Sequence, residues 1–248
     1  MPAQQSEAIA RLKAQLRELE TLARSSDAPR FSTGFPSLDR LLPGQGLTPG
    51  TLVEWLEDAP GSGAGTLAVK AAVQASHAGG AVVVIDGRGE FYPPGATCLG
   101  LDLRGVLLVR PTKIRDELWA IDQALRSGAV AAVLAWPLRA DERAMRRWQL
   151  AAEQCTTLGL FVRPTSVRDE PCWAELRLRV ATVPIELPVG EIASSVPRRL
   201  RVELLRARGD FAHRCIDLEL RHETSDVHRA VTTTQGRKHR PAPRRHAG

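Results

Sequence analysis

The glycine-rich segment at residues 60–66 is the part of the chain whose spacing most directly suggests chemistry. It reads PGSGAGT and lies between an apolar run at 52–56 and an alanine-rich run. Such a turn between a strand and a helix points backbone N–H groups at phosphate, as in a P-loop. A working P-loop ends in Gly-Lys-Ser/Thr, where the lysine binds the β- and γ-phosphates and the hydroxyl holds Mg²⁺. Here Ala64 and Gly65 follow Gly63, so we predict a loop that keeps its shape without its charge.

This degenerate loop supplies the candidate nucleotide-binding residues, and we expect most of that function to be lost. Thr66 stands one position late for the Mg²⁺ hydroxyl, and a shifted loop that uses it is the alternative. The candidates are Gly61, Gly63, Ala64, Gly65 and Thr66. No catalytic residue, metal-ligand set or cofactor is predicted elsewhere.

The positive charge of the chain lies in its last residues. The formal net charge is +6, and residues 227–248 contain six Lys and Arg and no acid, so residues 1–226 are neutral. A cationic segment of this kind binds nucleic acid without sequence preference, docks on an acidic partner, or only aids solubility. It has no aromatic residue for base stacking. The candidate binding residues are Arg237, Lys238, Arg240, Arg244 and Arg245.

Residues 6–24 have the pattern of an amphipathic helix. Apolar side chains recur at 3-4-3-4 spacing along one face, and charged residues fill the rest. The stripe consists of Ile9, Leu12, Leu16, Leu19 and Ala23. Two interpretations remain open: the helix docks on its own domain, or it is offered to another protein.

From Phe31 onward, apolar strands alternate with amphipathic helices, which is typical of a parallel sheet covered on both faces. The predicted strands are 51–56, 81–86, 106–109, 130–136 and 158–162, and the predicted helices are 66–78, 114–126 and 141–156. Segments 174–181, 199–205 and 215–220 alternate apolar and polar residues, which predicts half-exposed antiparallel strands at the end of the sheet. The fold class is therefore α/β. We divide the chain into an N-terminal helix and linker (1–30), a core (31–221) and a disordered basic tail (222–248).

Composition limits the remaining possibilities. No run approaches the ~18 apolar residues of a membrane span, and residues 1–13 lack a signal-peptide core. A cytoplasmic location without membrane contact is expected. The four cysteines are far apart and form no CxxC pair, which predicts reduced thiols.

The order of segments resembles the RecA recombinase core. Residues 31–55 (FSTGFPSLDRLLPGQGLTPGTLVEW) resemble the segment that leads into the RecA P-loop, and residues 82–103 resemble the next strand, which carries its catalytic glutamate. Residues 125–137 (LRSGAVAAVLAWP) resemble the strand that ends in its Mg²⁺-associated aspartate. The resemblance runs collinearly from about Phe31 to Leu220.

At each position where RecA has a functional side chain, this chain has a different residue. Besides Ala64 and Gly65, Arg88 stands at the catalytic glutamate, with Glu90 two residues later. Trp136 replaces the aspartate, and Pro164 replaces a polar sensor. We expect these positions to converge on one pocket that has lost ATP hydrolysis.

Other RecA elements are reduced or ambiguous. The stretches that correspond to its two DNA-binding loops are short, at 137–144 and 164–171. Arg206 and Arg208 resemble a lysine pair that caps a neighbouring subunit's nucleotide, and they are otherwise solvated. Arg143, Arg146 and Arg147, beside Trp148, form a basic helix face that we interpret as solvated.

A RecA-like core without a nucleotide site, with an N-terminal helix and a basic tail, most resembles the ImuA family. That resemblance implies an accessory role in SOS mutagenesis and translesion synthesis. The implied partners are RecA, the inactive Y-family polymerase homologue ImuB and, indirectly, an error-prone polymerase. Two alternatives stay open: a RecA/RadA-type DNA-dependent ATPase that uses Thr66 and Glu90, and a SulA-like cell-division inhibitor.

Overall fold

The structure is a computed structural model that describes residues 30–184, 198–207 and 214–220. The predicted helix at 6–24, with its apolar stripe, and the basic tail from 222 lie outside these ranges, as does Arg208.

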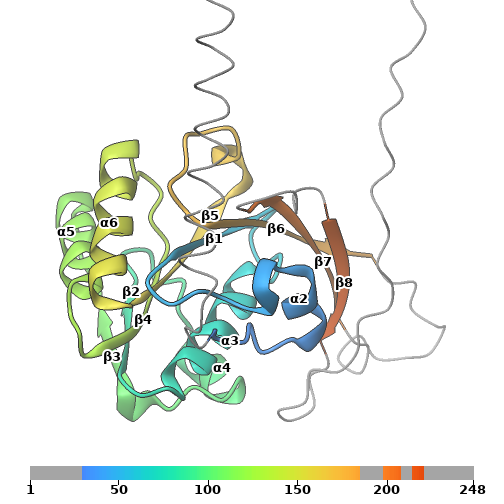
Figure 1. The fold of residues 1–248 in the computed structure, drawn as a ribbon, viewed down its shortest axis with the longest axis horizontal. Helices are drawn as coiled ribbons and strands as arrows, with labels where there is room; N and C mark the ends of the chain where they lie inside the picture. The colour runs from blue at the N-terminus through green and yellow to red at the C-terminus, as the bar shows by residue number, and fades with distance from the viewer. Residues whose placement is uncertain (1–29, 185–197, 208–213, 221–248) are drawn as a thin grey trace, which may run out of the picture.

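One mixed sheet organises the described residues (Figure 1). Its eight strands lie in the order β3-β2-β4-β5-β1-β6-β7-β8. In chain order they are β1 (Leu52–Glu57), β2 (Ala81–Ile85), β3 (Val106–Val109), β4 (Val130–Ala135), β5 (Leu158–Pro164), β6 (Leu176–Val183), β7 (Arg198–Arg206) and β8 (Arg214–Leu220). The first six strands in this order, β3, β2, β4, β5, β1 and β6, pair in parallel. Strand β7 pairs antiparallel with both β6 and β8. The predicted fold class, mostly parallel with antiparallel strands at the C-terminal edge, is confirmed.

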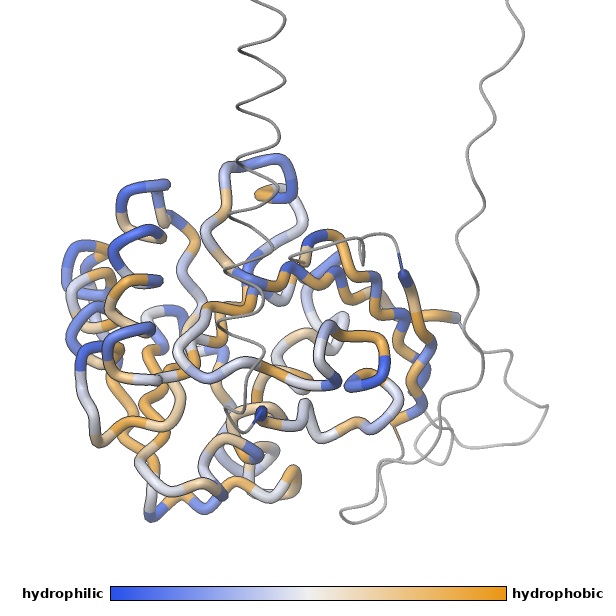
Figure 2. Tube along the Cα trace, viewed as in Figure 1, coloured by the Kyte–Doolittle hydropathy of each residue, from blue (hydrophilic) through white to orange (hydrophobic). Residues whose placement is uncertain are grey.

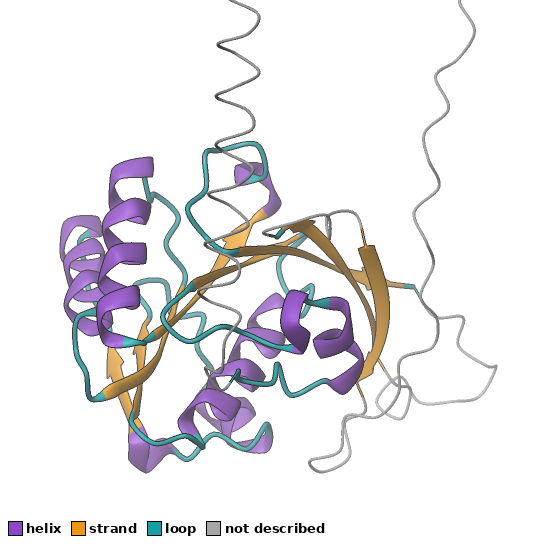
Figure 3. Ribbon diagram, in the orientation of Figure 1, coloured by secondary structure: helices purple, strands orange, loops and turns teal. Residues whose placement is uncertain are grey.

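Helices cover both faces of the sheet (Figure 3). The α3 face buries one apolar cluster and also carries the short helices α2 and α4, whereas α5 and α6 bury a second cluster on the opposite face. The helices are α2 (Pro36–Leu41), α3 (Ala64–Ser76), α4 (Pro93–Cys98), α5 (Ile114–Leu125) and α6 (Glu142–Cys155). The described residues also include three short 3₁₀ turns, at Pro43–Gln45, Leu103–Gly105 and Thr165–Val167.

The buried layers follow from the sequence pattern. Hydrophobic residues concentrate along the central strands, whereas the outer turns of α5 and α6 are hydrophilic (Figure 2). In α3, Ala68, Ala71, Ala72 and Ala75 are all fully buried. Their small side chains let this helix lie close to the sheet, so that it forms the centre of the larger cluster.

Three local expectations need correction. Helix α3 starts at Ala64, two residues before the predicted start, because Gly63 with φ of 98° forms its N-cap. The six-residue helices α2 and α4 were not predicted, since each is too short to show periodicity. Strand β6 was predicted to be half-exposed and antiparallel, but it also pairs in parallel with β1, and its Arg177 is buried.

Candidate functional site

The glycine-rich turn connects the end of β1 to the first turn of α3. Gly61 and Gly63 both have positive φ, at 76° and 98°, and the Ser62 amide donates to the Ala59 carbonyl at 2.9 Å. A Cβ on Gly63 would lie 2.5 Å from Leu200 Cδ1, so β7 packs directly against the turn. Protein packing therefore accounts for the glycine at position 63 without any phosphate.

The two positions that would bind phosphate and Mg²⁺ lie in the first turn of α3. Ala64 is buried, and Gly65 lies under the indole of Trp136, whose Cζ2 atom is 3.9 Å from where a Gly65 Cβ would be. Trp136 follows β4 and is 5% exposed, and its ring centroid is 6.5 Å from that of Phe91. An aromatic ring thus stands over the turn at the position predicted for a metal-associated carboxylate.

The charged side chains of the loop after β2 already have partners within the protein. The buried carboxylate of Asp86 accepts the amides of Glu90 at 2.8 Å and Phe91 at 3.3 Å, which fixes the loop. Arg88, at the position of the catalytic glutamate, pairs with Glu90 at 2.8 Å. Glu90 is therefore already paired and does not stand free as a displaced catalytic base.

The charged residues of this loop also shift the pKa values of two further glutamates, Glu57 and Glu117. Burial raises the pKa of Glu57, the last residue of β1, and Glu90 raises it further while Arg88 opposes them. Burial also raises the pKa of Glu117 on α5, where Arg88 lowers it and Asp86 raises it. A phosphate brought to this edge of the sheet would add another negative charge beside these two carboxylates, which acts on their pKa in the same direction as burial.

Strand registers bring most of the predicted positions to one edge. Glu57 lies beside Pro164, and Ile85 lies beside Ala135, which precedes Trp136. Ala64, Gly65, Arg88, Trp136 and Pro164 therefore gather around the carboxyl ends of β1, β2, β4 and β5. The residues found there do not fit a Mg²⁺–nucleotide, because the lysine and metal-ligand positions hold Ala64, Gly65 and a tryptophan ring.

Of the two arginines proposed as nucleotide cations, the structure describes Arg206, which has another contact. Arg206 donates to the Cys172 carbonyl, at the opposite end of β7 from Leu200 and the glycine-rich turn. Arg198, which was not singled out in the sequence, donates to the Gly61 carbonyl on that turn.

The basic face of α6 is divided among different contacts. Arg147 pairs with Asp122 at 3.0 Å, whereas the Arg146 guanidinium lies 5.2 Å from the ring centroid of Trp173. Trp148 is fully buried against Phe161, with ring centroids 5.2 Å apart, and does not belong to this surface.

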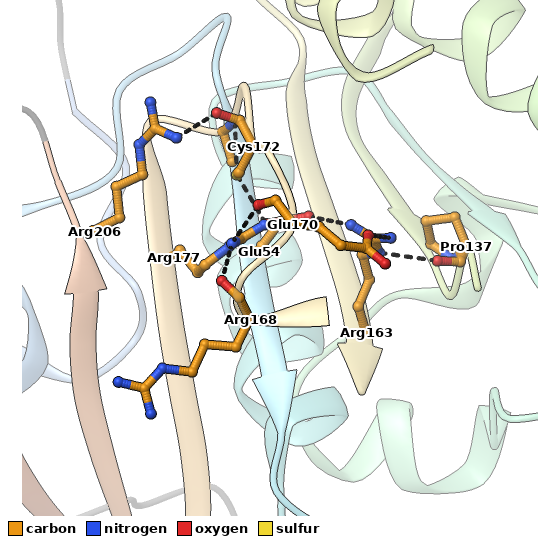
Figure 4. A network of polar contacts seen from close by, with 9 residues as sticks. Glu54, Pro137, Arg163, Arg168, Glu170, Cys172, Arg177 and Arg206 are labelled. Atoms are coloured by element: carbon orange, nitrogen blue, oxygen red, sulfur yellow. Dashed lines mark hydrogen bonds and ion pairs between the residues drawn. The ribbon is translucent and has the colours of Figure 1, made fainter. Parts of the chain in front are cut away.

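A buried ion network on the central strands was not predicted (Figure 4). Glu54 of β1 is fully buried, and its two oxygens accept Arg163 Nη1 at 2.9 Å and Arg177 Nε at 2.7 Å. The Cys172 thiol donates to the same carboxylate at 2.9 Å. The signal was available, since Glu54 interrupts an apolar strand and a buried carboxylate needs partners.

The pKa values in this network follow from burial and charge. Burial alone would raise the pKa of Glu54, but Arg177, the Cys172 hydrogen bond and Arg163 outweigh it, and the pKa is lowered. Burial and the Glu54 carboxylate raise the pKa of Cys172 to about 12. Cys172 is therefore a thiol at neutral pH and does not act as a nucleophile.

The network also fixes the stretches 137–144 and 164–171, which were predicted to correspond to the RecA DNA-binding loops. Arg163 Nε donates to the Pro137 carbonyl at 3.2 Å, and Arg177 Nη1 donates to the carbonyls of Arg168 at 2.6 Å and Glu170 at 3.1 Å. Buried guanidinium groups thus hold loop backbone from both stretches (Figure 4).

Within the described ranges, no group of three or more His, Cys, Asp or Glu side chains is placed to hold a metal ion. In the same ranges, no helix has the length and apolarity that crossing a membrane requires.

Comparison with known proteins agrees with this architecture. The model of the RecA N-terminal domain family matches residues 12–140. Protein ImuA of Caulobacter vibrioides strain NA1000 is 31% identical over 197 residues, which cover 73% of this chain and 80% of that protein.

The chain belongs to the ImuA family.

RecA proteins match a shorter part of this ImuA family member. The RecA of Crocosphaera subtropica is 34% identical over 119 residues, which cover 46% of this chain and 34% of that protein. The RecA of Streptomyces venezuelae is 35% identical over 100 residues, 40% of this chain and 26% of that protein. The family predicted from the collinear motifs is confirmed, and its core is RecA-like.

Proposed function

We propose that this ImuA family member is a non-catalytic accessory protein of SOS-induced translesion DNA synthesis. Family membership supports a RecA-like accessory role in mutagenesis. The observation that carries the non-catalytic part is the Trp136 indole over Gly65, at an edge that also holds Glu57 and Glu117.

Several catalytic parts are missing together, and their losses reinforce one another. Removing an arginine finger alone slows phosphoryl transfer by about 10³–10⁵. In this chain the lysine, the Mg²⁺ hydroxyl, the carboxylate base and the metal-associated aspartate are all replaced. The alternative of a shifted site needs Glu90, which Arg88 neutralises at 2.8 Å.

With the site lost, the fold is retained for its surfaces. We infer that the protein acts in the cytoplasm by contacting RecA and the polymerase homologue ImuB, and only indirectly the error-prone polymerase. The RecA-like core and the stripe from Ile9 to Ala23 support mimicry, in which the N-terminal helix docks on RecA and modulates its filament. The tail, with Arg237, Lys238, Arg240, Arg244 and Arg245, is the proposed contact for DNA or an acidic partner.

Capture of purified RecA by the immobilised chain tests the docking step. We expect deletion of residues 1–24 to abolish capture, and Leu16→Asp to weaken it because a charge then interrupts the apolar stripe. Gln15→Asp, at the neighbouring position outside the stripe of the predicted helix, is the matched control and should leave capture intact. Undiminished RecA capture by the deleted chain would show that the helix is not the docking element.

A parallel capture with the division protein FtsZ separates the remaining class of function. Retention of FtsZ, without retention of RecA, would favour the cell-division inhibitor over the accessory role.

A further inference from the structure

A cavity of about 330 Å³ lies between α6 and the segment 171–175, away from the degenerate nucleotide site. Its walls include Glu142 of α6, Trp173, Glu175 and Arg206. The Glu175 amide donates to the Leu52 carbonyl at the start of β1, whereas the glycine-rich turn follows the end of that strand. The cavity and the nucleotide-like site are therefore at opposite ends of β1.

The rim of this cavity has apolar surface that no described segment covers. Trp173 is 39% exposed although the Arg146 guanidinium lies 5.2 Å from its ring centroid. Outside the cavity wall, Leu150, one helical turn after Arg146 on α6, is 51% exposed. An exposed indole beside a cavity of this size can accept one or two aliphatic side chains.

The N-terminal segment enters the core next to this cavity. The Arg30 guanidinium donates to Thr48 Oγ1 at 3.0 Å, and that hydroxyl donates to Glu175 Oε1 at 2.8 Å, so one hydrogen-bond relay joins residue 30 to the cavity wall. Residues 25–29 span up to about 17 Å when extended. The predicted helix at 6–24 is about 28 Å long. Both lengths suffice for the helix to lie across the cavity of its own chain.

The chemistry of the segment matches that of the cavity. Its stripe offers leucines for the space beside Trp173, and Arg11, Lys13 and Arg17 accompany the stripe. Glu142 and Glu175 supply opposite charges in the cavity wall, beside Arg206, whose guanidinium donates to the Cys172 carbonyl. Attachment through a short linker gives an effective concentration of about millimolar, which favours docking within the chain over docking between copies.

We propose that residues 6–24 dock in cis on the cavity beside Trp173 and so cover the stripe that the proposed function assigns to RecA. Docking within the chain does not depend on the proposed function. Its effect on RecA binding does rest on the proposed function. RecA then competes with the chain's own cavity for one helix, so the cavity holds the protein in a closed state until RecA is abundant.

Trypsin cleavage of the purified chain, without RecA, measures the docked state. Sites at Arg11, Lys13, Arg17 and Arg24 are cut only when the segment is released, so the rate of N-terminal cleavage follows the open population. We expect Trp173→Ala to raise that rate about fivefold to tenfold. Trp119→Ala is the matched control, since Trp119 is an exposed tryptophan on α5, and it should leave the rate unchanged. Equal rates in the three proteins would overturn the proposal.

A second variant protects the test against misfolding of the first. Leu16→Asp changes only the segment and leaves the cavity intact. It should accelerate N-terminal cleavage as Trp173→Ala does, whereas Gln15→Asp should not. If neither Trp173→Ala nor Leu16→Asp accelerates cleavage, the segment does not dock on the cavity.

RecA capture distinguishes the failure of this inference from the failure of the proposed function. We expect Trp173→Ala to capture more RecA than the unmodified chain, because its helix is released. Unaltered cleavage combined with loss of RecA capture on deletion of 1–24 would refute cis docking alone. If cleavage is accelerated but deletion of residues 1–24 leaves RecA capture unchanged, only the proposed docking on RecA is refuted.

Discussion

Trp136 and Glu54 show how single buried residues hold this core, the first by packing in the degenerate nucleotide site and the second by charge pairing within the sheet. The indole of Trp136 covers the first turn of α3, and the carboxylate of Glu54 holds two guanidinium groups in the sheet. Each side chain is almost fully buried, so its removal has a measurable cost.

Trp136→Ala should lower the free energy of unfolding by about 3–5 kcal/mol, because it removes a buried aromatic side chain and leaves a cavity against Phe91. Urea unfolding of the purified chain measures this. Trp119→Ala, at a site that is 64% exposed, is the control and should change stability by about 0.5 kcal/mol or less. Equal effects of the two substitutions would show that Trp136 does not fill the site.

Glu54→Gln should cost about 3–5 kcal/mol at neutral pH, because it leaves Arg177 buried without its counter-charge and Arg163 paired with Glu170 alone. The folded-state pKa of Glu54 is lowered, so its stabilisation is present above the ordinary glutamate pKa of about 4.3 and is lost as pH falls through the folded-state value. The stability difference between the two proteins should therefore shrink below about pH 4.

Unfolding midpoints measured from pH 7 down to pH 3 give that comparison. Asp102→Asn breaks an Asp–Arg pair with Arg104 on the surface, at 2.9 Å, and should leave the neutral-pH midpoint unchanged. A Glu54→Gln difference that stayed constant with pH would mean that the carboxylate charge is not what stabilises the network.

At the scale of elements, the turn between β1 and α3 is held by its neighbours. Gly63 meets Leu200 of β7, whereas a Cβ on Gly61 would meet nothing within 4 Å. The two glycines have similar positive φ, so they separate backbone strain from packing.

Gly61→Ala should cost about 1 kcal/mol, from the left-handed backbone alone. Gly63→Ala should cost about 1–3 kcal/mol more, because its Cβ also clashes with the buried Leu200. Thermal or urea unfolding of the two variants measures the difference. Equal costs would contradict the close packing of β7 against this turn.

Apolar runs located the strands of the parallel sheet to within two residues, because strands covered on both faces need no polar alternation. The residues that replace the RecA site were also predicted, since each follows the carboxyl end of a located strand or begins the helix after it. Periodicity could not show that Arg177 turns inward to Glu54, because a partner 123 residues away leaves no local signal. The helices α2 and α4 were missed because six residues are too few to show helical periodicity.

At the scale of the whole molecule, charge is separated along the chain, with residues 1–226 neutral and six cations in residues 227–248. If the tail contacts single-stranded DNA through all six, log K should fall with log salt at a slope near −4. Deleting residues 227–248 should bring that slope close to zero. Fluorescence anisotropy with a labelled oligonucleotide measures both slopes, and an unchanged slope would place DNA binding on the core.

The central claim is that the chain keeps the RecA-like fold without its nucleotide site, and direct binding of a fluorescent ATP analogue tests it. The full chain, titrated in the presence of Mg²⁺ beside RecA as a positive control, should show no saturable signal and no competition by ATP. Saturable binding in the micromolar range that ATP displaces would contradict the account.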